Sequence, residues 1–218
     1  MIIEPTYDAV IHFHQPEQGY RFSEDSIALA NFVDLTGVKK AADFGAGCGV
    51  VGLAALEKGC SEMEKTSARP EVFYFIEREA ELLKSLRKNV DLYQKRSKSR
   101  LLIIPGDWRD LTEDDFGGPL DFIMANPPYF PAAASRPSPD PVRNAARREI
   151  FGGLPGLCGA IARLLSGSGR AAIILPAGRR GELEELVPQS GLTVNTVQPS
   201  SKFSSRHLIW ELVRSGSK

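Results

Sequence analysis

The feature that most constrains the fold is a glycine-rich turn that joins a short apolar strand to an apolar helix. The predicted strand covers residues 41–44, the turn runs from Gly45 to Gly49, and an apolar helical stretch covers residues 50–56. Glycines let the backbone turn tightly and approach a ligand closely at the N-terminus of a helix. We therefore expect a cofactor at the end of this strand.

Two residues beside the turn indicate which class of cofactor it binds. The dinucleotide-binding fingerprint requires a third glycine at about the position of Val50, so a nicotinamide cofactor is disfavoured. Asp43 lies two residues before the first glycine of the turn and would repel a pyrophosphate. The same carboxylate can help to hold a cationic ligand such as S-adenosylmethionine, which carries an ammonium and a sulfonium group.

Two later strand ends carry acidic residues that fit a nucleoside. A predicted strand at 72–76 ends at Glu77, before a helix over 78–93, and this carboxylate can accept hydrogen bonds from both ribose hydroxyls. A strand at 101–104 leads to Asp107, which can accept the amine of an adenine, and to Trp108, which can shelter its ring. An exposed carboxylate at a helix start is the alternative for Glu77, and core packing explains Trp108 equally well.

A second candidate site is the tetrapeptide 126–129, which follows an apolar strand at 122–125. Pro127 and Pro128 have a fixed φ and no N–H group, and Pro127 also keeps Asn126 extended, so the carbonyls are presented rigidly. The amide oxygen of Asn126 and a neighbouring carbonyl, expected to be that of Pro127, can accept the two hydrogens of a planar NH2 group. Tyr129 can stack on the ring that carries this group. A simple proline-rich turn is the alternative.

The rest of the chain alternates between helical and strand patterns. A leading helix begins near Ser23 or Asp25, either of which can cap it. Further segments are a helix through 157–165, a strand at 171–175, a helix at 181–187, and strands at 192–197 and 208–213. This alternation predicts a mostly parallel sheet with helices on both faces. A chain of 218 residues with 42% hydrophobic residues fits one domain.

Composition disfavours several classes of protein. No apolar run approaches the length of a membrane span, and the first residues lack the pattern of an export signal, so we expect a cytoplasmic protein without membrane contact. Three cysteines without ligand spacing, and His12 and His14 without companions, predict no metal. The formal net charge of zero argues against indiscriminate binding of nucleic acid, and we expect a monomer.

In order and relative position, these motifs resemble those of class I S-adenosylmethionine-dependent methyltransferases. The resemblance rests on residues 43–49, Glu77, Asp107 and the tetrapeptide, which is similar to that of enzymes methylating an exocyclic or amide nitrogen. Residues 19–32, with Ala146, Arg147 and Glu149, resemble the bacterial tRNA1(Val) (adenine-N6)-methyltransferase family. A polar insertion at 60–70 departs from the family pattern and is expected on the side of the sheet away from the ligand.

The resemblance implies an α/β, Rossmann-like domain over residues 1–218, with a seven-stranded, mostly parallel sheet whose last strand is antiparallel. Residues 1–37 would form a leading segment and helix that cover the cofactor site, and residues 38–218 would form the core. The implied cofactor is S-adenosylmethionine. Its implied binding residues are Phe22, Ser23, Asp43, Gly45, Ala46, Gly47, Gly49, Glu77, Arg78, Asp107, Trp108 and Asn126.

The implied reaction is methylation of the exocyclic amine of an adenine in RNA, most of all in tRNA, with Asn126, Pro127 and Tyr129 as catalytic residues. The implied substrate-binding residues are Pro128, Tyr129, Phe130, Arg143, Arg147 and Arg148. With Arg179, Arg180, Lys202 and Arg206, these arginines follow strand ends and are expected to rim the active-site face. Scattered solvated charge is an equally good explanation.

Other functions remain open at this stage. A protein glutamine N5-methyltransferase acting on a release factor would use the same tetrapeptide, but such enzymes carry a preceding helical domain, and the stretch before Asp43 is too short for one. An rRNA guanine N2-methyltransferase is a variant of the same idea. A non-catalytic RNA-binding scaffold is disfavoured because it need not keep the acidic, glycine and tetrapeptide residues together.

Overall fold

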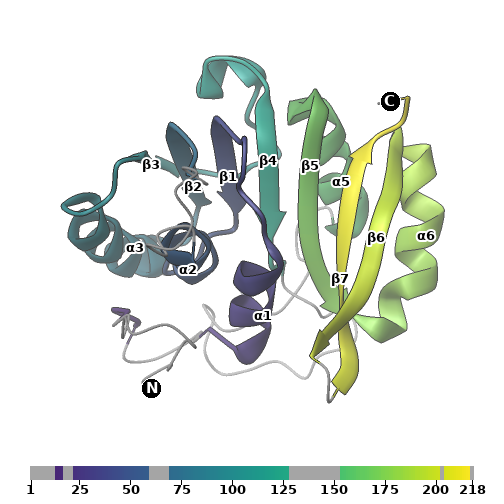
Figure 1. The fold of residues 1–218 in the computed structure, drawn as a ribbon, viewed down its shortest axis with the longest axis horizontal. Coiled ribbons are helices and arrows are strands. Elements are labelled where there is room, and N and C mark those ends of the chain that lie inside the picture. Colours follow the sequence, from purple (N-terminus) through teal and green to yellow (C-terminus); the bar gives the residue numbers. More distant parts are fainter. Residues whose placement is uncertain (1–12, 17–21, 59–68, 128–152, 202–203, 217–218) are drawn as a thin grey trace.

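A seven-stranded sheet forms the centre of the computed structural model, which describes residues 13–16, 22–58, 69–127, 153–201 and 204–216 (Figure 1). The strands are β1 (Lys40–Phe44), β2 (Val72–Glu77), β3 (Arg100–Pro105), β4 (Leu120–Ala125), β5 (Leu165–Pro176), β6 (Leu192–Ser201) and β7 (Ser204–Arg214). Their order across the sheet is β3-β2-β1-β4-β5-β7-β6, and β7 is antiparallel to both neighbours. The predicted fold class is confirmed, including the antiparallel last strand.

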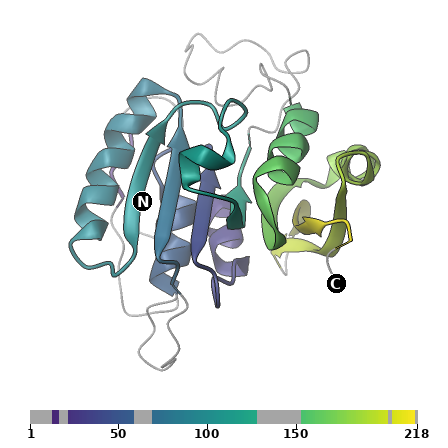
Figure 2. The same ribbon diagram turned by 90° about the horizontal axis from the view of Figure 1, so that it is seen from above.

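Helices cover both faces of this sheet (Figures 1 and 2). One face packs against α1 (Glu24–Phe32), α2 (Val50–Lys58) and α3 (Ala80–Gln94). The other face packs against α5 (Gly153–Leu164), α6 (Arg180–Gln189) and the 3-10 helix η1 (Glu113–Phe116), and a second 3-10 turn, η2 (Ala177–Arg179), follows β5. The central strands β1, β2 and β4 are therefore buried on both faces.

The apolar runs in the strands follow from this double covering. In β4, Phe122 and Met124 pack on the side of α1 to α3, whereas Ile123 and Ala125 pack on the side of α5 and α6. Successive side chains of a strand point to opposite faces, so a strand covered on both sides is apolar throughout. All four of these side chains are buried. The same alternation directs Asp43 of β1 toward α2.

Three element ends differ from the sequence-based predictions. Ser23 occupies the N-cap position of α1, but its hydroxyl lies 3.4 Å from the carboxylate of Asp25 and makes no capping bond. Helix α3 begins at Ala80 because the preceding two amides bind the carboxylate of Glu77 instead of starting the helix. Strand β5 begins at Leu165, which pairs with Leu120 before a register shift, and α5 therefore ends one residue earlier than predicted.

The described part of the chain holds no helix that is both long enough and apolar enough to cross a bilayer.

The basic residues that end α3 lie at the edge where the parallel strands begin. Arg96 lies over the ring of Tyr93, 4.9 Å from its centroid, and approaches the carboxylate of Glu57. This edge is opposite to the one at which the parallel strands end (Figure 1).

Candidate active site

The glycine-rich turn follows β1 and is tied to the neighbouring strand. The amides of Gly45 and Ala46 donate to the carbonyl of Ile76, at 3.0 and 2.9 Å. Gly45 and Gly47 have φ of 71° and 59°, a region that favours glycine. A Cβ atom added to either residue would meet nothing within 4 Å. These two glycines therefore leave the backbone of the turn open to a ligand.

Gly49, the last glycine of the turn, serves packing instead. A Cβ atom at this position would lie 2.8 Å from the side chain of Leu86 on α3, and its φ is 87°. Gly49 thus lets α3 approach the start of α2. The positions of Gly45, Ala46, Gly47 and Gly49 agree with those predicted for a cofactor loop, and their contacts with a cofactor stay a prediction.

Asp43 lies beneath the turn and is fully buried. Its carboxylate accepts a hydrogen bond of 3.0 Å from the backbone N–H of Gly52, in the first turns of α2. Burial raises the pKa of Asp43 to about 7, and the nearby charge of Glu77 adds to this rise, while the N–H of Gly52 opposes it. Asp43 therefore anchors α2 to β1, in addition to any contact with the predicted cationic ligand.

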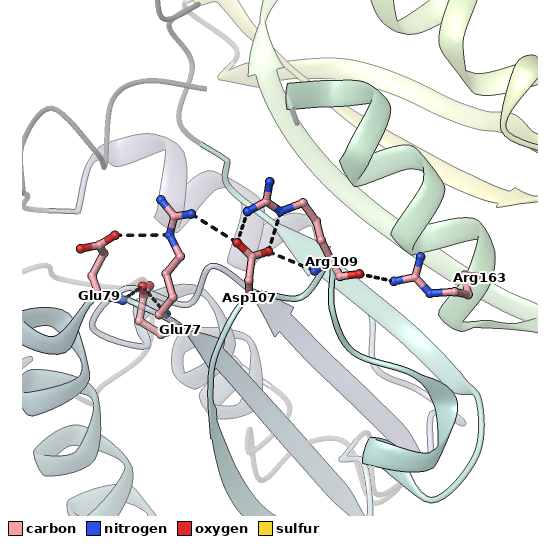
Figure 3. A network of polar contacts seen from close by, with 6 residues as sticks. Glu77, Glu79, Asp107, Arg109 and Arg163 are labelled. Atoms are coloured by element: carbon pink, nitrogen blue, oxygen red, sulfur yellow. Dashed lines mark hydrogen bonds and ion pairs between the residues drawn. The ribbon is translucent and has the colours of Figure 1, made fainter. Parts of the chain in front are cut away.

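Glu77 at the end of β2 is buried and faces the turn. Its Oε2 accepts from the N–H of Gly47 at 2.7 Å. Its Oε1 accepts from the N–H groups of Arg78 and Glu79, both at 2.8 Å (Figure 3). Burial raises the pKa of this carboxyl, although the three N–H groups act in the opposite direction. Because each carboxylate oxygen has two acceptor positions, Oε2 retains one that suits a ribose hydroxyl.

Asp107, after β3, lies between two arginines (Figure 3). Its Oδ1 accepts from Nε and from the backbone N–H of Arg109, at 2.7 and 3.1 Å, and its Oδ2 accepts from a second Arg109 nitrogen and from Arg78 at 3.2 Å. The hydrogen bonds from Arg109 lower the pKa of Asp107 to about 2. All four acceptor positions are used, so an adenine amine would have to replace one of these donors.

The loop that carries Asp107 is fixed from its other side. A guanidinium nitrogen of Arg163 on α5 donates to the carbonyls of Arg109 and Leu111, at 2.9 and 3.1 Å (Figure 3). The ring of Trp108 stacks on that of Phe44, with centroids 5.9 Å apart and an interplanar angle of 2°. Trp108 also packs against the core on the α5 side, which is the packing role that the sequence left open.

Asn126 follows β4 and contacts α1. Its amide nitrogen donates to the hydroxyl of Ser26 at 2.9 Å. Asp25 precedes Ser26 on α1, and its Oδ1 lies 3.1 Å from Nδ1 of His207, near the start of β7. Helix α1 therefore joins the end of β4 to β7, and Asn126 and Pro127 lie where the sequence predicts. Their catalytic roles stay predictions.

The leading segment also lies beside the glycine-rich turn. Phe22 is buried and packs edge-on against Phe13, with ring centroids 5.7 Å apart. The amide of Asn89 on α3 pairs with both backbone groups of His14, at 2.8 and 2.9 Å, and donates to the carbonyl of Cys48 at 2.7 Å. One side chain thus connects the leading segment, α3 and the turn.

Two residues of this arrangement, Ser26 and Asn89, were not predicted from the sequence. Both are buried polar residues on the apolar face of a helix. Ser26 shares its face with Leu29, Ala30 and Val33, and Asn89 shares its face with Leu82, Leu86 and Tyr93. A polar residue within an apolar stripe is the signal that would have indicated both, because burying an unpaired polar group is costly.

Several predicted site residues lie outside the described residues. They are Pro128, Tyr129, Phe130, Arg143, Arg147 and Arg148, together with Lys202 and most of the insertion at 60–70. Of the predicted basic rim, Arg179 and Arg180 pair with Glu182 and Glu184 on α6, at 2.7 and 2.9 Å. Among the described residues, no group of three or more His, Cys, Asp or Glu residues could hold a metal ion.

Two relatives named tRNA1(Val) (adenine(37)-N6)-methyltransferase show the similarity in sequence. The protein of Shewanella putrefaciens is 27% identical over 187 residues, which cover 83% of this chain and 71% of the relative. The protein of Shewanella loihica is 26% identical over 205 residues, which cover 91% of this chain and 79% of the relative. No family model matches the chain. The resemblance drawn from the motifs is confirmed.

Solved structures show the same fold at low sequence identity. A candidate RNA methyltransferase of Pyrococcus horikoshii superposes with a TM-score of 0.57 at 17% identity, covering 88% of this chain and 82% of that chain. A ribosomal protein L11 methylase of Lactobacillus delbrueckii superposes with a TM-score of 0.58 at 12% identity, covering 88% of this chain and 77% of that chain. These likenesses support the Rossmann-like sheet described above.

Proposed function

We propose that this chain, a class I S-adenosylmethionine-dependent methyltransferase, methylates the exocyclic amine of an adenine in RNA, and that the RNA is tRNA. The observation that carries the proposal is the position of Asn126 directly after β4. Strand β4 pairs in parallel with β1, and Ala125 is the partner of Phe44, so Asn126 and the glycine-rich turn follow adjacent strand ends. Ligands of such sheets bind beyond the carboxyl ends of the strands.

The residues at these strand ends fit the cofactor. The open backbone at Gly45 and Gly47 would accommodate its amino-acid part, and Oε2 of Glu77 offers an acceptor for the ribose. When bound, S-adenosylmethionine supplies an electrophilic methyl group on a sulfonium. The other residues of the proposed set are Phe22, Ser23, Asp43, Ala46, Gly49, Arg78, Asp107, Trp108 and Asn126.

Asn126 and Pro127 are proposed to orient the target amine. The lone pair of an adenine amine is delocalised into the ring, so the amine is a weak nucleophile. Two acceptors, Oδ1 of Asn126 and the carbonyl of Pro127, would hold both hydrogens and direct the lone pair toward the methyl group. Transfer would form a bond between this nitrogen and the methyl carbon as the carbon–sulfur bond of the sulfonium breaks, which leaves a neutral thioether. The methylated nitrogen would carry a positive charge and release a proton to solvent, so no general base is required beforehand.

Covalent catalysis by the thiol of the turn does not fit the structure. Cys48 is buried, and burial raises its pKa to about 12, so the thiolate is scarce at neutral pH.

We propose that Tyr129, with Pro128 and Phe130, captures the base, and that Arg143, Arg147 and Arg148 position the phosphates. An RNA substrate also implies a cytoplasmic location.

The test is the single-turnover rate of Asn126→Ala on tRNA from a strain that lacks this gene. We expect the rate of methyl transfer to fall by about 100-fold or more, as for loss of a preorganised polar group. Cofactor affinity measured by calorimetry should stay within a few-fold. Mass analysis of the nucleosides identifies the methylated base, and a release-factor substrate tests the protein alternative. A parental rate for Asn126→Ala would refute the two-acceptor mechanism.

A further inference from the structure

We propose that Ser26 of α1 is a positioning residue for methyl transfer, because it orients the side-chain amide of Asn126. The inference rests on the role proposed for Asn126. The hydroxyl of Ser26 accepts a hydrogen bond of 2.9 Å from Nδ2 of Asn126. A side-chain amide is planar, so a partner that fixes its nitrogen also fixes the direction of its oxygen.

The direction of the amide decides whether Asn126 can serve as an acceptor. A rotation of about 180° about the last side-chain torsion exchanges oxygen and nitrogen with little change in shape. The rotated amide would present its NH2 group to the NH2 group of the target, and two donors would face each other. A serine hydroxyl can also donate, so the contact with Ser26 fixes where the amide group lies, and in the observed arrangement the nitrogen is turned toward α1 and the oxygen away from it.

The burial of Ser26 makes this bond strongly directing. Its side chain lies on the apolar face of α1 and is only 2% exposed. A buried hydroxyl is costly unless it forms a hydrogen bond, and here the amide of Asn126 is its partner. The two groups lie 100 residues apart in the chain. Their pairing therefore fixes the position of α1 relative to Asn126 at the end of β4.

Helix α1 is itself held firmly, which makes Ser26 a rigid support. Leu29 and Ala30 are buried in the core shared with α2 and α3. Near its N-terminus, Asp25 pairs with His207 at 3.1 Å, and after its C-terminus the carbonyl of Val33 accepts from Nζ of Lys58 at 3.1 Å. A catalytic group gains most from a supporting residue that cannot itself move.

The experiment measures single-turnover methyl transfer to the same tRNA for Ser26→Ala, Asn126→Ala and the double variant. Loss of one neutral hydrogen bond should slow Ser26→Ala by about three- to tenfold, with unchanged cofactor affinity. In the Asn126→Ala background, the same change should cost no further rate, because Ser26 acts through Asn126. Ser85→Ala, a buried serine on α3, is the matched control and should keep the parental rate.

The outcomes separate this inference from the proposed function. If Asn126→Ala is slow but Ser26→Ala is not, the positioning role is wrong and the proposed function stands. Equal slowing by Ser26→Ala in both backgrounds would show a merely structural role and would also overturn it. Ser26→Cys, which keeps the size but accepts hydrogen bonds weakly, replaces Ser26→Ala if the latter fails to fold and should show the same dependence on Asn126.

Discussion

At the scale of single residues, the acidic groups of the site are held first by the backbone. Asp43 accepts from the N–H of Gly52, and Glu77 accepts from three N–H groups around the turn. Both carboxyls are buried, and burial raises both pKa values. The protein therefore keeps titratable groups in its interior near the proposed cofactor site, which makes part of its stability depend on pH.

The substitution Asp43→Asn should change this dependence. Burial raises the pKa of Asp43 to about 7, whereas the pKa of an aspartate in an unfolded chain is about 3.9. Between about pH 4 and 7 the folded state binds a proton that the unfolded state has released, so stability falls as the pH rises through this window. An amide has no such proton. We expect the melting temperature of Asp43→Asn to depend less on pH over this range. At pH 8 the variant no longer buries a charged carboxylate, and its melting temperature should rise by about 2–4 °C for each kcal/mol of stability gained.

Thermal melts of the cofactor-free protein from pH 4.5 to 8 provide the measurement. Asp91→Asn, at an exposed position on α3, is the control and should leave the slope unchanged. An unaltered slope in Asp43→Asn would show that another group titrates in this range. The variant should also bind S-adenosylmethionine more weakly if the carboxylate attracts the ammonium.

Replacing Glu77 tests the proposed ribose contact. We expect Glu77→Ala to weaken binding of S-adenosylmethionine by about 1–3 kcal/mol, the scale for hydrogen bonds to a charged group. Calorimetry measures this affinity, and Glu81→Ala, an exposed carboxylate on α3 paired with Lys84, is the control. Unchanged affinity in Glu77→Ala would remove this residue from the cofactor site.

The sequence identified residues at strand ends better than residues on helices. Glu77 and Asn126 were found because an acidic or amide residue directly follows a buried strand, and the structure places both at one edge of the sheet. The engagement of Asp107 by Arg109 and Arg78 could not be inferred, since local spacing does not show which donors reach a carboxylate. Ser26 was missed because its partner lies 100 residues away.

At the scale of elements, residues 13–16 of the leading segment are attached to α3 and to the glycine-rich turn by the hydrogen bonds of one side chain. Asn89 holds residue 14 through both of its backbone groups and also holds the carbonyl of Cys48. These bonds replace the regular backbone pairing that a strand or helix would provide. The position of the leading segment beside the turn therefore depends strongly on one amide.

The variant Asn89→Ala should loosen this attachment. This change removes the partner of the N–H and the carbonyl of His14, which are partly buried, and of the carbonyl of Cys48, which is buried. Each buried group left unsatisfied should cost about 1–3 kcal/mol. We expect a lower melting temperature, faster hydrogen exchange at residues 13–16 and weaker cofactor binding. Lys88→Ala, at an exposed neighbouring position, is the control. Unchanged exchange at residues 13–16 would contradict the attachment.

Element positions were predictable, whereas several element ends were not. Apolar runs located the strands because both faces of the sheet are covered. The start of β5 at Leu165 depends on pairing with Leu120, and the start of α3 depends on amides that bind Glu77. Such ends are decided by contacts with other elements, which periodicity along a single segment does not encode.

At the scale of the whole molecule, the net charge is zero, and described basic residues lie at both edges of the sheet. Lys95 and Arg100 are exposed where β3 begins, at the edge away from the site. Arg206 is exposed near the start of β7, at the edge of the candidate site. Arg179 and Arg180, at the same edge, pair with Glu182 and Glu184 on α6.

The proposed phosphate contacts of Arg147 and Arg148 lead to a prediction about RNA binding. Reversing Arg147 and Arg148 to Glu should weaken tRNA binding and flatten its dependence on salt, because each lost phosphate contact lowers the logarithmic slope by about 0.7–0.9. The double variant should therefore lose about 1.4–1.8 from the slope while cofactor affinity stays unchanged. Reversal of Lys95 and Arg100 is the matched control, since it makes the same change in net charge at the edge where the parallel strands begin. If the control flattens the slope and the Arg147 and Arg148 variant does not, RNA binds at the edge where the strands begin.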